Sequence, residues 1–412
     1  MKYQITAPKT LQGTISLPAS KSISNRALVI RALASGQTPI ENLADCDDTQ
    51  VIIKAFAGNN EVVDIKAAGT AMRFLTAYYS TQPGTHILTG TERMKQRPIS
   101  ILVDALRQLG AQIDYVNHEG YPPLHITGKP LQSVPLTLPG DVSSQYVSAL
   151  LMIGPTLPQG LQLSLTGQVT SLPYIDMTLQ QMHDFGTSAS RSESACPMQI
   201  EVKPGGYQDI PYIIENDWSA ASYWYEMVAL CEDEEASVAL PHLYEHSTQG
   251  DWKGTQLFRQ LGVQTAFTPQ GIRLFKQGDL PERLDYDFRE IPDLAQTFVV
   301  TCCLLQIPFR FSGLHTLRIK ETDRISALIS ELRKLGYVLY AEGDDVLLWE
   351  GERCQVEDDP IIATYDDHRM AMAFAPAALK LPHITIDHPE VVTKSYPRYW
   401  EDLTKAGFRI DQ

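Results

Sequence analysis

The sequence predicts an α/β protein with two domains, each assembled from three repeated units of about 75 residues. Three observations support this fold class. A helical pattern that ends in a hydrophobic residue and a glycine recurs at nearly regular intervals, a strand-like stretch follows it, and the length of 412 residues suffices for two domains with separate cores. The recurring pattern ends at Gly110, Gly186, Gly262, Gly336 and Gly407.

Each of these glycines suits the position just after a helix, where the backbone turns left-handed and other residues are strained. Strand-like stretches follow at 111–116, 263–268 and 337–342. An earlier helical segment ends at Gly58, only about 50 residues before Gly110, so the first unit should be shorter than the others. Coincidence among the 26 glycines of the chain is the alternative interpretation.

The first long helix is expected to begin near Ser20 or Lys21 and to stop before Gly36, because apolar residues recur at helical spacing between these points. Its first two turns carry Lys21 and Arg26. The free amide groups and the dipole at this end of a helix favour an anion over a cation. The arrangement therefore calls for a negative partner.

Other predicted helices begin in the same way. Thr70 is a candidate N-cap, Pro98 suits the first position of a helix, and Arg369 follows aspartates that can cap a third helix. Lys320 and Arg324 should lie one turn apart on one face of a fourth helix. The cations at these predicted helix starts are Lys21, Arg26, Arg73, Arg93, Lys95, Arg97, Lys320, Arg324, Arg369 and Lys394.

Any one of these cations is most simply a surface charge that is solvated or paired. Together they favour a small ligand, or two, with several negative groups, because a bound anion accepts hydrogen bonds from free helical amides and balances the cationic side chains. Neutral helix starts fit the same site, since hydroxyl and amide groups can hold a phosphate or a polyol, although capping explains the serines equally well. These polar residues are Ser143, Ser144, Gln145, Ser171 and Tyr174.

Two carboxylates in the second half of the chain are candidates for proton transfer. Asp293 lies in the stretch IPDLAQT, and Glu321 lies in KETDR between two of the cations. An aspartate ahead of an apolar segment is more often a helix cap than a catalytic group, so both interpretations of Asp293 stay open.

Composition excludes several classes of partner. The formal net charge of −15 argues against nucleic acid and against an anionic membrane. The N-terminal stretch has no signal or transit character, and no apolar run is long enough to span a membrane, so we expect a cytoplasmic protein. The cysteines form no CxxC pair, which is typical of a reducing compartment and makes a metal site unexpected. They are Cys46, Cys196, Cys231, Cys302, Cys303 and Cys354.

The motifs LPASKSISNRAL, AAGTAMRFL, LTGTERMKQRPI, GDVSSQYVSALL, SLPYIDMT, IPDLAQT, RIKETDRI, YDDHRMAMAFA and VVTKSYPRYW occur in this order from about residue 8 to the C-terminus. In order and nearly in spacing, the chain resembles the 5-enolpyruvylshikimate-3-phosphate synthases, a family of enolpyruvyl transferases. The resemblance implies two inverse α/β barrel domains of three βαβαββ units each. Domain 1 would comprise residues 1–19 and 215–412, and domain 2 residues 20–214. The active site would lie in the cleft between them, in a monomer without cofactor or metal.

The resemblance also implies a reaction. The 5-hydroxyl of shikimate 3-phosphate would displace phosphate from phosphoenolpyruvate by addition and elimination through a tetrahedral intermediate. Asp293 would be the base on the hydroxyl, with Lys21 and Glu321 in the proton transfers at the vinyl carbon. The division of these protons stays open, although a lysine beside phosphates should stay protonated and suits an acid.

The same resemblance assigns substrate contacts, which account for the number of cations because each substrate carries a phosphate and a carboxylate. The residues expected to contact shikimate 3-phosphate are Ser22, Arg26, Ser143, Ser144, Gln145, Ser171, Tyr174, Asp293, Thr316 and Lys320. The residues expected to contact phosphoenolpyruvate are Lys21, Gly69, Arg97, Gln145, Arg324, Arg369 and Lys394.

Four positions depart from the family pattern. Ala67 and Thr316 stand where asparagines are usual, Phe74 replaces a frequent proline, and Leu172 replaces a basic residue. Two alternative functions are kept. The related transferase of UDP-N-acetylglucosamine has a cysteine in the loop that matches TERMKQRP, a loop without cysteine in this chain. A non-catalytic anion-binding homologue would not need the three catalytic candidates, all of which are present.

Overall fold

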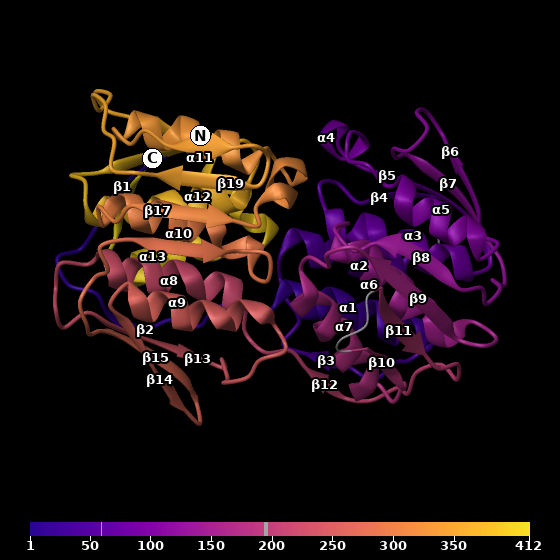
Figure 1. Ribbon diagram of the computed structural model, residues 1–412. Helices are drawn as coiled ribbons and strands as arrows, with labels where there is room; N and C mark the ends of the chain where they lie inside the picture. The colour runs from indigo at the N-terminus through magenta and orange to yellow at the C-terminus, as the bar shows by residue number, and fades with distance from the viewer. Residues whose placement is uncertain (59, 193–196) are drawn as a thin grey trace. The chain divides into compact units, whose positions relative to one another are not determined.

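The computed structural model describes residues 1–58, 60–192 and 197–412, and its chain divides into two compact units (Figure 1). Unit 1 comprises Met1–Ser20 and Glu215–Gln412, and unit 2 comprises Lys21–Ile214. The last residue of the first segment of unit 1 is hydrogen-bonded to the first residue of the second segment. The Ser20 amide donates to the Glu215 carbonyl over 2.8 Å. Among the cysteines, Cys196 lies outside the described residues, and the other five are free thiols.

Three four-stranded sheets of one topology build unit 1. In each sheet two strands run parallel, and an antiparallel pair extends the sheet beyond the second of them. The first sheet contains β2 (Gln12–Thr14), β13 (Ser237–Pro241), β15 (Gly271–Lys276) and β14 (Val263–Thr268). The second contains β16 (Leu284–Asp287), β17 (Phe309–Ser312), β19 (Val346–Trp349) and β18 (Tyr340–Glu342). The third contains β20 (Ile361–Ile362), β21 (Ile384–Asp387), β1 (Lys2–Thr6) and β22 (Arg409–Asp411).

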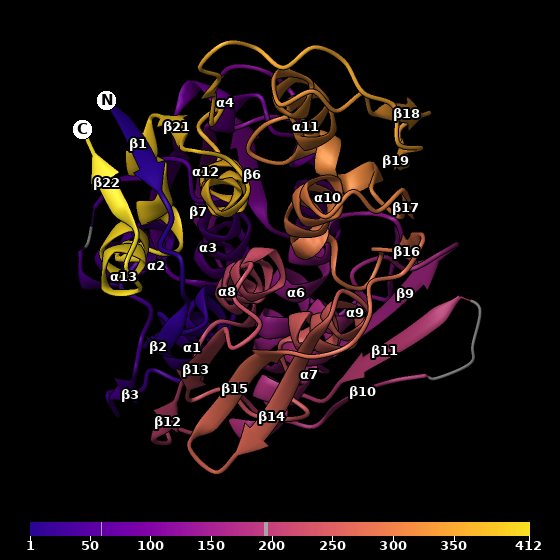
Figure 2. The ribbon, with the colours of Figure 1, turned by 90° about the vertical axis from the view of Figure 1, so that its left-hand side faces the viewer.

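The helices of unit 1 fall into an inner and an outer set. Every residue of the three inner helices is buried, as expected of helices that are apolar on all sides. They are α8 (Trp218–Leu230), α10 (Ala295–Leu304) and α12 (His368–Phe374). Figure 2 shows them in the middle of the unit with the three sheets around them. The outer helices are α9 (Gly254–Gln260), α11 (Arg324–Lys334) and α13 (Tyr399–Lys405), and the short 3₁₀ turns are η2 (Gly250–Lys253), η3 (Pro292–Leu294), η4 (His315–Ile319), η5 (Ala375–Leu379) and η6 (Pro389–Lys394).

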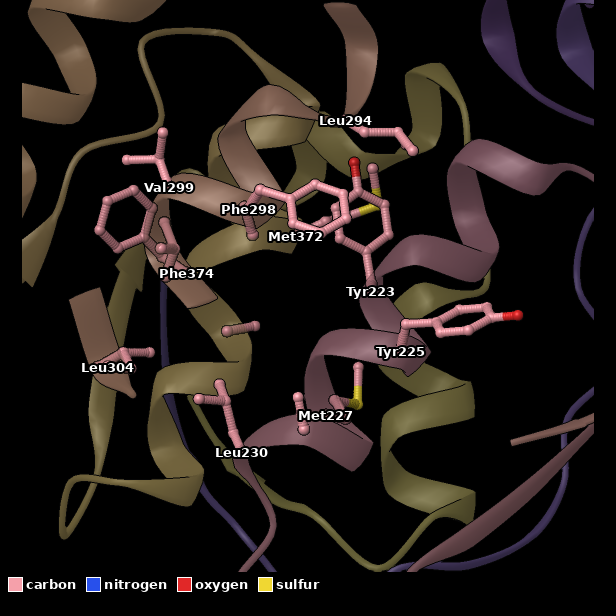
Figure 3. Packing of buried hydrophobic residues seen from close by; sticks show 14 of the residues in the cluster. Tyr223, Tyr225, Met227, Leu230, Leu294, Phe298, Val299, Leu304, Met372 and Phe374 are labelled. Carbon is pink, nitrogen blue, oxygen red and sulfur yellow. The ribbon is translucent and has the colours of Figure 1, made fainter. Parts of the chain in front are cut away.

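The core of unit 1 forms where the inner helices meet, since α10 contacts both α8 and α12. Figure 3 shows Tyr223 of α8, Phe298 of α10 and Met372 of α12 packed together. A polar residue lies just before each of these helices, namely Asp217, Asp293 and Asp367, so a buried apolar core holds three helix starts in place.

Unit 2 repeats the topology in a reduced form. Two four-stranded sheets contain β4 (Val62–Asp64), β5 (Gly84–Thr89), β7 (Leu124–Gly128) and β6 (Gln112–Tyr115), and β8 (Leu136–Pro139), β9 (Leu161–Thr166), β11 (Met198–Val202) and β10 (Ala189–Arg191). The third sheet, within the described residues, consists of two parallel strands, β3 (Ile40–Glu41) and β12 (Tyr212–Ile213). The expected α/β fold of repeated units is therefore confirmed, including the shortened first unit.

Seven α-helices belong to the described part of unit 2. They are α1 (Lys21–Leu33), α2 (Asp47–Ala57), α3 (Gly69–Thr81), α4 (Glu92–Lys95), α5 (Ser100–Gln108), α6 (Ser144–Ile153) and α7 (Leu172–Asp184), with the 3₁₀ turn η1 (Gly154–Thr156) after α6. Helix α3 packs against α1 and α6, and α6 packs against α7. In the described ranges of both units, no helix is long and apolar enough to cross a membrane.

The helix ends follow the glycine pattern with two exceptions. The five recurring glycines have φ between 75° and 96°, which confirms the left-handed closures. Gly58 is extended, with φ of −113°, so its assignment as the same kind of closure is wrong. Ser35, with φ of 53°, takes the left-handed position after α1 in place of Gly36.

Three expected helix starts are also wrong, each because a tertiary contact or another cap decides the boundary. Thr70 is not an N-cap but lies in the first turn of α3, where its hydroxyl accepts a hydrogen bond from Gln145. Pro98 lies before α5, and Arg73 donates to its carbonyl. Asp323 caps α11, so Lys320 lies ahead of the helix instead of one turn inside it.

Glu226 carries a carboxyl group into the core of unit 1. It lies in the middle of α8 and is fully buried. Burial raises the pKa of this group well above its usual range, so the folded protein holds it as a neutral acid. The unfolded chain ionises the same group at its ordinary pKa, and the folded state therefore loses stability as the pH rises above that value.

We expect Glu226→Gln to stabilise unit 1 at pH 8 and to have no effect near pH 4. The gain should grow by up to about 1.4 kcal/mol per pH unit between these limits, because one proton is involved. All five tryptophans lie in unit 1, so urea unfolding followed by tryptophan fluorescence reports on this unit. A gain that does not change with pH would contradict a buried neutral acid.

Candidate active site

Asp293 is the centre of a charged cluster in unit 1. It lies in η3, directly before the inner helix α10. Its Oδ2 accepts from Arg369 over 2.9 Å, and its Oδ1 lies 3.5 Å from Arg324 and 3.6 Å from the Lys320 ammonium. The Asp293 carbonyl accepts a second hydrogen bond from Arg369 over 3.0 Å. Three cations therefore surround one carboxylate.

These cations dominate the electrostatics of Asp293. Burial alone would raise the pKa of its carboxyl, but the charges of Arg369, Lys320 and Arg324 outweigh burial and hold the pKa well below its usual range. Asp251, whose Oδ2 accepts a hydrogen bond from the Ser219 hydroxyl, responds in the opposite direction. Burial, followed by the charge of Asp293, raises the pKa of the Asp251 carboxyl to about 7. One carboxyl is therefore firmly ionised and its neighbour titrates near neutrality.

Arg324 connects Asp293 to two further carboxylates. The side chain is only 1% exposed, and its Nε donates to Asp367 over 2.7 Å. A terminal nitrogen donates to Glu321 over 2.9 Å, and the other oxygen of Glu321 accepts from Lys394 over 3.0 Å. Although burial acts to lower the pKa of Arg324, the three carboxylates raise it overall. The side chains joined in this way, here called the unit 1 cluster, are Asp293, Lys320, Glu321, Arg324, Asp367, Arg369 and Lys394.

Helix starts hold the unit 1 cluster in place. Arg324 is the first residue of α11, and Arg369 is the second residue of α12. Asp367 caps α12 by accepting from the Arg369 amide over 2.9 Å, which confirms the predicted capping aspartate. The same Asp367 binds Arg324, so a helix cap also orients a neighbouring helix start. The cluster lies where helix amides add to the positive charge.

Lys21 begins α1 in unit 2, as expected from the sequence. Its ammonium lies 3.4 Å from Asp48, in the first turn of α2, and both side chains are largely buried. A buried carboxylate at this distance favours the charged form of the lysine. Asp48 is a site residue that the sequence did not reveal, because an acidic residue in a first helical turn reads simply as a dipole partner.

Gly69 and Arg97 lie against each other in unit 2. A Cβ atom added to Gly69 would come within 2.6 Å of the Arg97 guanidinium, so a side chain at this position would displace that guanidinium. Gln145, in the first turn of α6, donates to the hydroxyl of Thr70 over 3.2 Å. The starts of α3 and α6 and the segment with Arg97 therefore meet at one place, here called the Gly69 corner.

Arg73 connects two segments of the Gly69 corner. Its guanidinium donates to the Gly69 carbonyl over 3.2 Å and to the Pro98 carbonyl over 3.1 Å. It also lies over the ring of Tyr146, whose hydroxyl donates to the same Pro98 carbonyl. The sequence predicted Arg73 only as one of ten cations at helix starts. These contacts show that it also joins the start of α3 to the segment that contains Pro98.

Arg26, on the second turn of α1, has a different environment. Its side chain donates to the hydroxyls of Thr178 over 2.7 Å and Ser148 over 3.1 Å, and to the Ser22 carbonyl over 2.9 Å. A longer contact of 3.5 Å reaches the Tyr174 carbonyl. Burial lowers the pKa of this guanidinium to about 10. Ser22, Arg26 and Tyr174, predicted as parts of one site, are thus neighbours.

The remaining predicted residues lie at or near helix starts, but only one of them is a side-chain cap. Ser143 caps α6 by accepting from the Gln145 amide over 3.4 Å, which agrees with the capping interpretation, and Ser144 begins the helix. Ser171 precedes α7 with φ of 53° and provides no side-chain cap, so the capping interpretation does not apply to this serine. Thr316 lies half-buried in η4, which leads into Lys320.

The structure therefore gathers most predicted residues into local groups within each unit. Eight of the ten predicted cations are at most 26% exposed, a value reached at Lys320; they are Lys21, Arg26, Arg73, Arg97, Lys320, Arg324, Arg369 and Lys394. Arg93 and Lys95 differ, since both belong to α4, where Arg93 is exposed and Lys95 pairs with Glu92 over 2.7 Å. In the described ranges, no group of His, Cys, Asp and Glu is arranged to hold a metal ion.

Comparisons with known proteins agree on one family. A family model described as EPSP synthase (3-phosphoshikimate 1-carboxyvinyltransferase) matches residues 5–58 and 52–403. A 3-phosphoshikimate 1-carboxyvinyltransferase of Bacteroides fragilis is 60% identical over 410 residues, covering 100% of this chain and 99% of the relative. One of Vibrio cholerae is 35% identical over 427 residues, covering 96% of this chain and 97% of the relative.

Solved structures share the fold at low sequence identity. The EPSP synthase of Acinetobacter baumannii superimposes with a TM-score of 0.78 at 22% identity, and the alignment covers 100% of both chains. The enolpyruvyl transferase NikO of Streptomyces tendae gives a TM-score of 0.74 at 16% identity, covering 100% of this chain and 98% of that one.

Proposed function

We infer that this chain, which belongs to the EPSP synthase family, is an enzyme with 3-phosphoshikimate 1-carboxyvinyltransferase activity. It transfers the enolpyruvyl group of phosphoenolpyruvate to the 5-hydroxyl of shikimate 3-phosphate and releases phosphate, a step of the shikimate pathway. The observation that carries this conclusion is the 60% identity to a relative of this name along the full chain. The alternatives, a UDP-N-acetylglucosamine transferase and a non-catalytic homologue, are not favoured.

For the chemistry, Asp293 is the base that takes the proton of the 5-hydroxyl. Its low pKa makes it a weak base for as long as Arg369, Lys320 and Arg324 stabilise the carboxylate. The phosphate and carboxylate groups of the substrates compete for these cations. As the cations turn to the substrates, the pKa of Asp293 rises toward the range in which it accepts a proton.

Lys21 and Glu321 serve the proton transfers at the vinyl carbon. The contact with Asp48 favours the protonated form of Lys21, so the lysine is suited to donate a proton to the methylene carbon during addition. Glu321 is held between Arg324 and Lys394, which keep it ionised and fix its position. A carboxylate in this state is suited to accept a proton during elimination.

The binding assignments follow the local groups. Lys394, Arg369 and Arg324 of the unit 1 cluster, with Lys21, Gly69, Arg97 and Gln145 of unit 2, contact phosphoenolpyruvate. Shikimate 3-phosphate contacts Ser22, Arg26, Ser143, Ser144, Gln145, Ser171, Tyr174, Asp293, Thr316 and Lys320. Support comes from the burial of the cations and from their place at helix starts, where amides also bind anions. We further propose a monomer of the cytoplasm that needs no cofactor, in keeping with the five free thiols.

An assay of phosphate release tests the activity directly. With both shikimate 3-phosphate and phosphoenolpyruvate present, the protein should release phosphate and form the enolpyruvyl product, which mass spectrometry identifies. Omission of either substrate should abolish release. Turnover of UDP-N-acetylglucosamine instead, or no turnover of the pair, would overturn the proposal.

Arg73→Met should raise the KM for phosphoenolpyruvate about tenfold or more and leave the KM for shikimate 3-phosphate within about threefold. The reason is that Arg73 holds the carbonyls of Gly69 and Pro98, and with them Arg97, without reaching the substrate groups assigned to Arg26. Steady-state kinetics with each substrate varied in turn measures both constants.

Arg107→Met provides the matched control for this prediction. Arg107 also belongs to unit 2, donates to a backbone carbonyl, that of Ile113, and lies over a tyrosine ring, that of Tyr115. It has no contact with the Gly69 corner, so its loss should leave both KM values unchanged. Equal effects of the two substitutions would show that Arg73 stabilises the fold alone.

A further inference from the structure

Arg26 is a buried cation without an anionic partner in the described chain. The residue is 2% exposed, and its hydrogen bonds go to hydroxyl and carbonyl oxygens. Among the described carboxylates, none forms an ion pair with it. An uncompensated charge in a protein interior is costly, so the site favours a ligand that brings a negative group.

Two aromatic rings lie against the Arg26 guanidinium. The ring centre of Phe74 is 5.3 Å from its central carbon, and the ring centre of Tyr174 is 5.9 Å away. Both distances lie within the range of cation–π attraction, which is strongest where water is excluded. Phe74 belongs to α3 and is itself buried. The rings supply part of the stabilisation that a carboxylate would otherwise supply.

Phe74 is also a departure from the family pattern, in which a proline is frequent at this place. A proline offers no π face, so the contact with Arg26 is a property of this chain's own side chain. We propose that Phe74 is a positioning residue whose ring holds the Arg26 guanidinium in place for a negative group of shikimate 3-phosphate. This inference rests on the proposed function, which assigns that substrate to Arg26.

The proposal predicts an effect confined to one substrate. Phe74→Leu keeps an apolar side chain but removes the π face, and it should raise the KM for shikimate 3-phosphate about threefold to thirtyfold. The KM for phosphoenolpyruvate should stay within about twofold. Phe74→Tyr keeps the π face and should restore most of the affinity. Calorimetric titration with shikimate 3-phosphate alone should reproduce the order of the three proteins.

Phe185→Leu is the matched control, because Phe185 is a fully buried ring of the same unit that packs on Tyr212 and has no contact with Arg26. It should lower stability without a selective change in either KM. Circular dichroism and thermal unfolding establish that each variant is folded. If Phe74→Leu does not fold, Phe74→Met, which fills the space with a flexible chain, carries the same expectation.

A double substitution separates positioning from packing. In an Arg26→Gln background no cation remains, so the addition of Phe74→Leu should change kcat/KM for shikimate 3-phosphate by less than about twofold. This ratio is read from initial slopes even where binding is too weak to saturate. The inference is overturned by an undiminished effect in that background, by equal changes in both KM values, or by a similar result for Phe185→Leu. Absence of turnover in the unaltered protein would instead overturn the proposed function.

Discussion

Asp293→Asn is expected to lower kcat by a factor of about 10² to 10⁴, the usual contribution of a general base. Shikimate 3-phosphate should bind at least as tightly as before, because the amide removes one negative charge from a cluster of cations. A purely structural role would weaken binding together with turnover. The opposite signs of the two effects therefore identify a catalytic carboxylate.

Steady-state kinetics with saturating substrates measures kcat, and calorimetry measures the binding of shikimate 3-phosphate. Asp287→Asn is the control, since Asp287 also pairs with an arginine, Arg289, but lies partly exposed at the end of β16. It should leave kcat unchanged. A kcat for Asp293→Asn within tenfold of the unaltered enzyme would remove Asp293 from the role of base.

Arg324→Met should lower the free energy of unfolding of unit 1 by about 3–5 kcal/mol. Arg324 is the cation that pairs with the fully buried Asp367 and with Glu321, and its loss leaves both carboxylates in a site built around a positive charge. Catalysis should fail as well, because Asp293 and Glu321 lose a shared partner. The stability change distinguishes this residue from a surface cation.

Urea unfolding followed by tryptophan fluorescence measures the change in unit 1, to which all five tryptophans belong. Arg283→Met is the control. Arg283 also pairs with two carboxylates, Asp285 and Glu350, but its side chain is 37% exposed. Exposed pairs contribute at most about 1 kcal/mol, so the control should be nearly neutral. Similar shifts for both substitutions would show that burial does not strengthen the pairing of Arg324.

Local signals in the sequence predicted the repeated fold well. A glycine after a helix reports a left-handed backbone, which depends on a few neighbouring residues, and all five recurring glycines adopt it. Helix starts were predicted less well, because Pro98 and Thr70 are engaged by Arg73 and Gln145 from other segments. Contacts of this kind leave no trace in local patterns.

In the candidate site, too, the sequence predicted single residues but not the contacts between distant segments. The motifs named individual cations and carboxylates, and Asp367 was expected as a cap. Its second role, the ion pair with Arg324, joins residues 43 positions apart and could not be read from spacing. Asp251 was missed for the same reason, whereas Asp48 was missed because an acidic residue in a first helical turn is usually a partner of the helix dipole. The contact between Phe74 and Arg26 also joins separate helices, although the unusual phenylalanine was visible in the motif.

Whether the charged groups of both units act on one reaction is tested most directly by turnover of two single variants. Lys21→Met alters unit 2, and Glu321→Gln alters the unit 1 cluster. Phosphate release from phosphoenolpyruvate, measured with shikimate 3-phosphate at saturation, should fall by a factor of about 10² to 10⁴ in each. Near-normal release by either folded variant would contradict a single site that draws its proton transfers from both units.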